Sequence, residues 1–131
     1  MKDIQALKEF LHSPKKIVIT THANPDADAL GSSLGLHHFL LAEGHEVTTI
    51  VPNSYPDFLS WMPGNDSVIN YEKSTAQAED LLNQADLLFC LDYSGLGRIK
   101  RMKSAVEGLK AKVALVDNHL NTEIEPAFNF W

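Results

Sequence analysis

Hydrophobic and polar positions along this chain predict strands that alternate with helices. Short apolar runs rich in β-branched residues are typical of buried strands, and they occupy residues 16–22, 45–52, 67–70, 86–92 and 111–117. Helices are predicted over residues 3–11, 28–43, 74–85 and 99–108. Strands that alternate with helices imply right-handed crossovers between parallel neighbours. We therefore predict an α/β, Rossmann-like domain with a five-stranded, mostly parallel sheet and helices on both faces.

The same pattern predicts where several helices begin or end. Asp3 is placed to cap the first helix, and Gly44 is placed to stop the second. Ser74 followed by Gln77 is a capping-box pattern at the start of the third. Residues 54–64 are predicted to be irregular. The apolar run "EPAFNFW" at residues 125–131 indicates a segment that is cut or continues into something further.

Length and composition are those of an ordinary globular domain. The chain has 131 residues, of which 44% are hydrophobic and 21% are charged, and it contains no apolar run of membrane-spanning length. The N-terminus has acidic residues and no apolar core, unlike a secretion signal. A single cysteine, Cys90, excludes an internal disulfide, and its apolar neighbours predict a core position. We expect a cytoplasmic protein that does not bind membranes.

The charge balance excludes one class of partner. The net charge is −6, from 17 acidic and 11 basic residues, whereas binding along duplex DNA needs clustered Lys and Arg. We therefore expect no duplex DNA binding. A short anionic substrate stays open, because bound divalent cations would reverse the local field.

Polar residues with metal-binding side chains follow three of the predicted strands. In a parallel sheet, ligands bind beyond the carboxyl ends of the strands. The architecture therefore brings these candidates, which are far apart in the sequence, to one edge of the sheet. They are His22, Asp26 and Asp28 after the first strand, Asp92 after the fourth, and Asp117, Asn118 and His119 after the fifth.

Carboxylates together with imidazoles suit Mn²⁺, Fe²⁺, Co²⁺ or Zn²⁺. Two such ions roughly 3.5–4 Å apart can generate a hydroxide and hold a phosphoryl group. The helix that starts near Asp28 offers free N–H groups around Ser32 to an anion, while Asn24 shapes the preceding turn. Taken one at a time, these aspartates could equally be turn or capping residues. The other histidines, His12, His37, His38 and His45, are expected at the surface.

Three motifs, "HANPDADALGS", "LDYSG" and "VDNHLN", together resemble the DHH phosphoesterase superfamily in their order and spacing. The resemblance extends from about residue 3 to residue 128. It implies an enzyme that uses two Mn²⁺ ions, with Mg²⁺ or Co²⁺ as substitutes, to hydrolyse phosphodiesters, phosphomonoesters or pyrophosphate.

The resemblance also implies a role for each matching residue. His22 and Asp26 would hold the first metal and Asp28 the second, with Asp92 bridging the two ions. His119 would face the substrate phosphate, so that His119 and Asp92 are the catalytic pair. Support from behind the site would come from Asp117, with Asn24 and Ser32 near the substrate.

This chain departs from the family pattern in two respects. Asn118 stands where the family has a histidine ligand of the second metal, and an amide oxygen binds Mn²⁺ more weakly than imidazole. A further acidic ligand and a smaller C-terminal substrate-binding domain, both usual in the family, do not occur in residues 1–131. We expect residues 1–131 to be a truncated N-terminal catalytic domain.

Among subfamilies, the resemblance is greatest to enzymes that degrade very short RNA (nanoRNases) and dephosphorylate 3′-phosphoadenosine 5′-phosphate (pAp). The expected partner is thus a short oligoribonucleotide or a nucleotide bisphosphate, and a homodimer stays open. One alternative is a manganese-dependent inorganic pyrophosphatase. Another is a nucleotide-binding, regulatory domain whose catalysis Asn118 has weakened. A dinucleotide-binding module is poorly supported, because no G-x-G-x-x-G turn follows a strand.

Overall fold

A computed structural model of the chain describes residues 2–21, 27–52, 67–91, 111–116 and 128–130. The described helices are α1 (Lys2–Phe10), α2 (Ala27–Ala42) and α3 (Thr75–Gln84). The described strands are β1 (Lys16–Thr21), β2 (Glu46–Val51), β3 (Ile69–Asn70), β4 (Leu87–Leu91), β5 (Lys112–Val116) and β6 (Phe128–Phe130). The predicted helix over 99–108 and the irregular segment over 54–64 lie outside the described residues.

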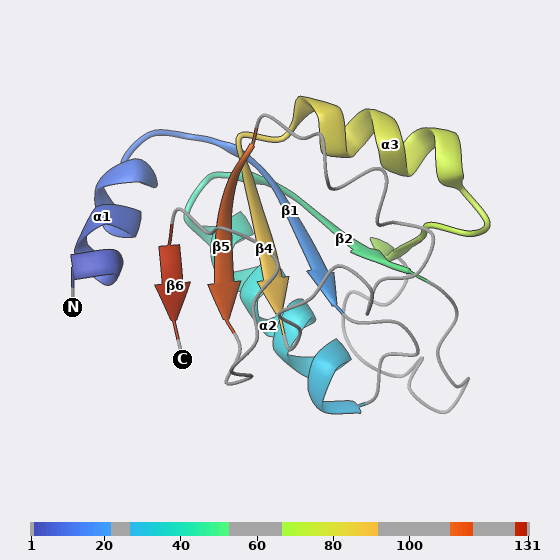
Figure 1. Cartoon of the computed structure of the whole chain (residues 1–131), viewed down its shortest axis with the longest axis horizontal. Coiled ribbons are helices and arrows are strands. Elements are labelled where there is room, and N and C mark those ends of the chain that lie inside the picture. Colours follow the sequence, from blue (N-terminus) through green and yellow to red (C-terminus); the bar gives the residue numbers. More distant parts are fainter. Residues whose placement is uncertain (1, 22–26, 53–66, 92–110, 117–127, 131) are drawn as a thin grey trace.

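The strands form one sheet in the order β3-β2-β1-β4-β5-β6, and every pair of neighbours is parallel (Figure 1). This confirms the predicted α/β class with a parallel sheet. The sheet has a sixth strand that the sequence pattern did not predict, because β6 lies in the apolar run near residue 131. A short apolar run cannot be assigned from periodicity alone. Here it pairs with β5 through Ala114 and Phe128.

Helices cover both faces of the sheet, as predicted, and each face has its own hydrophobic core. Side chains alternate along β1, so Val18 lies on one face while Ile17 and Ile19 lie on the other. The face of Val18 packs against α3, with a core of Val18, Ile50, Tyr71, Ala78, Leu82, Ala85, Leu88 and Cys90. The opposite face packs against α1 and α2, with a core of Ile17, Ile19, Leu40, Leu87, Phe89, Leu91 and Ala114. Cys90 is thus a core residue, as its apolar neighbours predicted.

Helix α2 ends as the sequence predicts. Gly44 has a φ of 93°, a left-handed conformation that few residues other than glycine adopt readily. The N–H of Gly44 bonds to the carbonyl of Leu41, and the N–H of His45 bonds to the carbonyl of Leu40. These two bonds make a Schellman motif, which satisfies carbonyl groups at the helix end. The chain then enters β2 at Glu46.

The two predicted N-terminal caps had different outcomes, because Asp3 does not hold the N-cap position of its helix and Ser74 does. Helix α1 begins at Lys2, so Asp3 lies inside the first turn and does not precede it. Ser74 occupies the N-cap position of α3, but its side chain makes no capping hydrogen bond. The hydroxyl of Thr75 instead donates to the carbonyl of Tyr71 over 2.7 Å. The N–H of Ser74, which the Gln77 side chain would accept in a capping box, donates instead to the carbonyl of Asn70, so the predicted capping box does not form.

Two of the histidines that were expected at the surface are buried, so that prediction was wrong for them. His37 is 4% exposed and His45 is 6% exposed. Each has a hydrogen-bond partner that offsets the cost of burial. His37 Nδ1 lies 3.0 Å from Thr49 Oγ1 of β2, and His45 Nδ1 accepts from the N–H of Lys15 over 3.0 Å. His12 and His38 are exposed, as predicted.

None of the described helices combines the length and apolar character that a membrane crossing requires. The longest, α2, has 16 residues.

Candidate functional site

Three neighbouring strands, β1, β4 and β5, end in one row at the same edge of the sheet. Thr21 of β1 stands opposite Leu91 of β4, and Leu91 stands opposite Val116 of β5. In Figure 1 the arrowheads of these strands point toward the same edge. In the sequence, the residues that follow these ends are His22, Asp92 and Asp117. We call the row of Thr21, Leu91 and Val116 the carboxyl edge. The predicted site residues follow this edge in the sequence.

Most of the predicted site residues follow this edge in the sequence and lie outside the described residues. Two of them fall within α2. Asp28 is in the first turn of the helix, and Ser32 is exposed in the next turn. The arrangement of the Asp28 side chain and of the remaining site residues stays a prediction. These remaining residues are His22, Asn24, Asp26, Asp92, Asp117, Asn118 and His119.

The start of α2 belongs to the same edge. Ala27, its first residue, follows Thr21 by six positions in the sequence, so the helix begins near the carboxyl edge and runs back along the sheet (Figure 1). The first N–H groups of a helix lack partners within it and carry partial positive charge. Gly31 is exposed, and a methyl group built on it would meet nothing within 4 Å. The start of a helix is in general a favourable place for an anion.

Polar residues replace apolar ones in the last two positions of β1. Ile17, Val18 and Ile19 form the apolar part of the strand, and Thr20 and Thr21 complete it, both 0% exposed. Thr20 Oγ1 donates to the carbonyl oxygen of Phe89 in β4 over 3.2 Å. Sequence reasoning did not single out these threonines, because a β-branched residue in a strand needs no further explanation.

A second buried polar pair joins α2 to the sheet. His37 Nδ1 lies 3.0 Å from Thr49 Oγ1, and Thr49 is 0% exposed. Burial lowers the pKa of His37 below its ordinary value of 6.5, and the neighbouring His38 lowers that pKa further. Both effects favour the neutral imidazole, which suits a buried hydrogen bond to a hydroxyl. The pair fixes the helix against β2.

Within the described ranges, 2–21, 27–52, 67–91, 111–116 and 128–130, no three His, Cys, Asp or Glu side chains lie close enough to hold a metal ion. This finding does not bear on the predicted ligands, whose side chains are not among those described. The histidines and acidic residues elsewhere in the described part of the chain therefore do not offer a competing metal centre.

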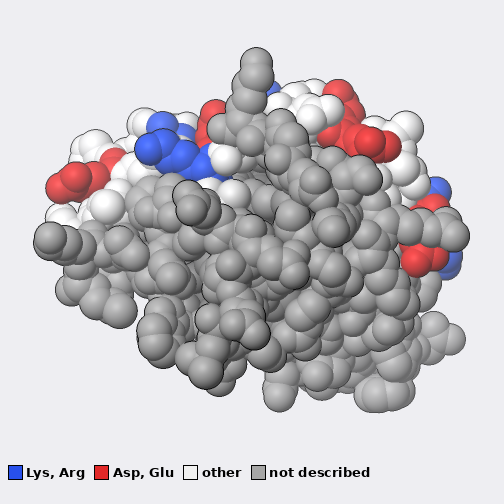
Figure 2. Space-filling view, viewed as in Figure 1, with Lys and Arg blue, Asp and Glu red and all other residues white. Residues whose placement is uncertain are grey.

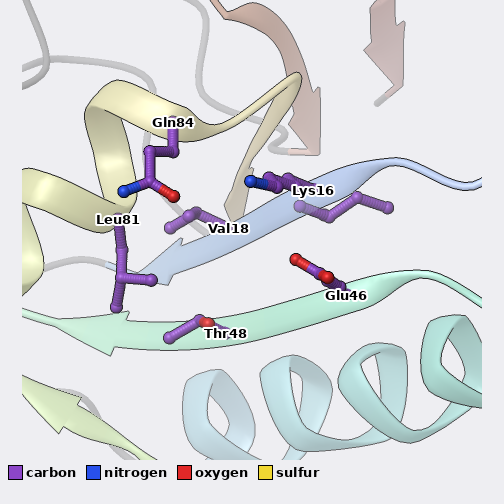
Figure 3. Close-up of a pocket in the computed structure, with 7 residues that line it drawn as sticks. Lys16, Val18, Glu46, Thr48, Leu81 and Gln84 are labelled. Carbon is purple, nitrogen blue, oxygen red and sulfur yellow. The ribbon is translucent and has the colours of Figure 1, made fainter.

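A small pocket lies at the opposite end of the strands (Figure 3). Lys16 and Glu46 begin β1 and β2 and stand opposite each other in register. In Figure 3, Leu81 and Gln84 of α3 extend down toward these two strands. The lining of the pocket combines aliphatic groups with two exposed, oppositely charged side chains, Lys16 and Glu46. The pocket thus belongs to the amino ends of the strands, away from the carboxyl edge.

The charges of the described residues form no continuous basic patch on the face shown in Figure 2. Acidic and basic side chains lie interspersed along its upper edge. An extended, strongly positive surface is what broad binding to nucleic-acid backbones requires.

Comparison with protein families gives a match over most of the chain. Residues 16–130 match the model of the DHH family, N-terminal domain. The matched range includes β1, α2 and all the predicted site residues. Among curated proteins, none matches this chain.

Comparison with solved structures gives a near neighbour and more distant ones. The crystal structure of an exopolyphosphatase-related protein from Bacteroides fragilis is similar with a TM-score of 0.93 and 38% sequence identity. The match covers 98% of this chain and 38% of that protein, so this chain spans well under half its length. An α-glucosyltransferase in complex with UDP and DNA is similar with a TM-score of 0.60 and 17% identity, over 79% of this chain and 29% of the other. That second likeness concerns the fold alone.

Proposed function

The chain belongs to the DHH family, whose N-terminal domain matches residues 16–130, and on that basis we propose that it hydrolyses phosphate esters with the help of divalent metal ions. The observation that carries the proposal is the common row formed by Thr21, Leu91 and Val116. In the sequence, each of these strand ends leads directly into one of the family's motifs. The similarity to an exopolyphosphatase-related protein supports the same chemical class.

The donor set of the motifs fits a transition metal. His22, Asp26, Asp28 and Asp92 combine imidazole with carboxylates, and these ligand types suit Mn²⁺ better than Ca²⁺ or Mg²⁺, which favour oxygen ligands alone. When bound, two such ions would activate a water and stabilise the charge that develops on the phosphoryl group. We propose Mn²⁺, with Mg²⁺ or Co²⁺ as substitutes.

The other site residues would bridge the metals and bind the substrate. Asp92, at the end of the central strand β4, would bridge the two halves of the site. His119 would contact the substrate phosphate, and Asp117 would support the site from behind. The first turn of α2, which begins at Ala27, would supply N–H groups to a second phosphate or a terminal oxygen. Ser32 lies in the next turn, with its exposed side chain near the substrate.

The proposed substrates are short oligoribonucleotides and nucleotide bisphosphates such as pAp. Both are small anions that a site at one edge of a sheet can enclose, and neither needs an extended basic surface. A net charge of −6 would work against longer nucleic acids.

The test is an assay of the purified protein on a dinucleotide, on pAp and on pyrophosphate, each with Mn²⁺, with Mg²⁺ and with EDTA. We expect hydrolysis of the dinucleotide or of pAp with Mn²⁺ and none with EDTA. Asp26→Ala should abolish it, whereas Asp80→Ala should not, because Asp80 is exposed on α3 and bonds only locally to Gln84. If none of the substrates is cleaved with any metal, the proposal is wrong.

Asn118 favours one second candidate, a nucleotide-binding domain with little turnover. An amide in place of an imidazole would weaken the second metal position and slow the reaction without preventing binding. This candidate predicts that Asn118→His raises the rate of hydrolysis. An unchanged rate would leave the phosphoesterase proposal as the better one. Preferential cleavage of pyrophosphate would instead indicate an inorganic pyrophosphatase.

A further inference from the structure

Thr20 places a hydroxyl group between the two central strands, next to the carboxyl edge. It stands opposite Cys90 of β4 and Ile50 of β2 in the register of the sheet, and it is 0% exposed. Its Oγ1 donates to the carbonyl oxygen of Phe89 over 3.2 Å and lies 3.9 Å from Cys90 Sγ. The side chain therefore ties β1 to β4 in addition to the backbone hydrogen bonds of the ladder.

A hydroxyl at this position needs a compensating bond. Burying a hydroxyl costs free energy unless it finds a partner, and valine has the same shape and an equal preference for strands. The three positions before this one, Ile17, Val18 and Ile19, carry purely apolar side chains. The bond from Thr20 to Phe89 satisfies the hydroxyl, and it also resists sliding of β1 along β4.

We propose that Thr20 is a positioning residue for the metal site, which it serves by holding the ends of β1 and β4 in register. This inference rests on the proposed function, in which His22 and Asp92 are ligands. In the sequence, Thr20 and Cys90 each come two positions before one of these residues. A shift of one strand along the other at this row would be transmitted directly to the spacing of the two predicted ligands.

Metal sites tolerate little error of this kind. Distances between metal and ligand must agree within about 0.2 Å of their usual values, and supporting groups must hold a site to within about 0.5 Å. Loss of a supporting hydrogen bond typically weakens metal binding by about 10- to 100-fold. Because Thr20 acts through two backbones, we expect an effect near the lower end of that range.

The chain offers a matched control in Thr49. It is also a strand threonine, it is also 0% exposed, and its hydroxyl also has a buried partner, the ring of His37. That partner lies in α2, so Thr49 does not join β1 to β4. Thr20→Val and Thr49→Val therefore remove the same group from equally buried sites, but only the first loosens the predicted ligand pair.

The experiment measures binding of Mn²⁺ to the purified protein by titration calorimetry and by the electron paramagnetic resonance spectrum of the bound ion. Thr20→Val should weaken binding by about 10-fold and broaden the spectrum, and Thr20→Ser should restore both. Thr49→Val should lower the melting temperature without changing Mn²⁺ affinity by more than about 2-fold. Because Thr20→Ala and Thr20→Ser differ only by the hydroxyl, their comparison gives the same test if the valine variant does not fold.

Two results would overturn the inference. Equal Mn²⁺ affinity in Thr20→Ala and Thr20→Ser would show that the hydroxyl does not position the site. Equal weakening by Thr20→Val and Thr49→Val would show a general loss of stability. If the unmodified protein binds no Mn²⁺ at all, the proposed function itself fails, and that outcome is distinct from both.

Discussion

Strand β4 has an aspartate immediately before it and another immediately after it in the sequence, at opposite ends of the strand. Asp86, at the amino end, is exposed, and its carboxylate accepts from the N–H of Lys16 over 2.8 Å. Its backbone bonds to Lys16 on one side and to Lys112 on the other. Asp92, at the carboxyl end, follows the row that β1, β4 and β5 share. One aspartate joins strands to each other, and the other is predicted to bind metal.

The difference agrees with a general property of parallel sheets, in which ligands bind at the carboxyl ends of the strands. At the amino ends, Lys16, Glu46 and Asp86 are charged and exposed, so water stabilises their charges. At the carboxyl end of β1, Thr20 and Thr21 are polar but fully buried. Exposed charge needs no particular geometry, whereas a buried polar group must have a partner in a fixed place.

The largest expected effect comes from removing the aspartate at the carboxyl end. Asp92→Ala should lower the rate of Mn²⁺-dependent hydrolysis by about 100-fold or more, because a bridging ligand contributes more than the supporting groups around it. The free energy of unfolding of the Asp92→Ala variant, measured by urea denaturation without metal, should differ little from that of the unmodified protein. A rate close to that of the unmodified protein would remove the basis for treating this edge as the site.

The matching change at the amino end should have the opposite profile. Asp86→Ala removes the acceptor for the N–H of Lys16, and should lower the free energy of unfolding by about 1 kcal/mol. The rate of hydrolysis should stay within about 2-fold, since distant sites act independently. A large loss of activity together with intact folding would mean that the two ends of β4 are not functionally distinct.

A glycine-to-alanine substitution should have opposite effects on stability in two places, the turn before β2 and the middle of α2. Gly44→Ala should destabilise the protein by about 1 kcal/mol, because Gly44 has a φ of 93°. Gly35→Ala should instead stabilise it by roughly 0.5–1 kcal/mol, since Gly35 is an exposed helical residue with open space around it. Thermal unfolding of both variants measures the contrast.

The smallest expected effect is a pH dependence from His37. Its pKa is lowered in the folded state by burial and by His38, so below pH 6.5 the unfolded chain binds more protons than the folded one. Stability should therefore fall as the pH drops below 6.5, until the folded-state pKa is passed. In urea denaturation at several pH values, His37→Gln should show a shallower acidic slope than the unmodified protein. Equal slopes would assign the pH dependence to other groups.

The sequence predicted the central part of the fold well, because each signal there has one dominant cause. The β-branched runs of β1 and β2 are buried strands, and Gly44 ends α2 with the conformation that favours glycine. The helix caps were less predictable, since Ser74 and Asp3 can make several local hydrogen bonds that differ little in energy. The burial of His37 was not predictable from the periodicity of α2, because its polar partner, Thr49, lies on a different element, strand β2.

The meeting of three strand ends at one edge was predictable from the sequence, whereas the arrangement of the site residues that follow them stays a prediction. Parallel strands place their carboxyl ends together, so the sequence alone could bring residues after positions 21, 91 and 116 to one edge. The contribution of Thr20 was not predictable in this way. Its hydroxyl bonds to the carbonyl oxygen of Phe89, which lies 69 positions away in the sequence, and no local sequence pattern predicts such a pairing.

That separation has a consequence for how the protein folds. The two strands at the centre of the sheet, β1 and β4, come from distant parts of the chain, and Thr20 and Cys90 are 70 positions apart. Pairing them requires closing a long loop, which costs chain entropy before any contact compensates for it, so sheets of this kind fold slowly. During synthesis, the carboxyl edge can form only after residues 87–91 become available to β1. Until then β1 has an unpaired edge, which is a feature that chaperones protect in newly made chains.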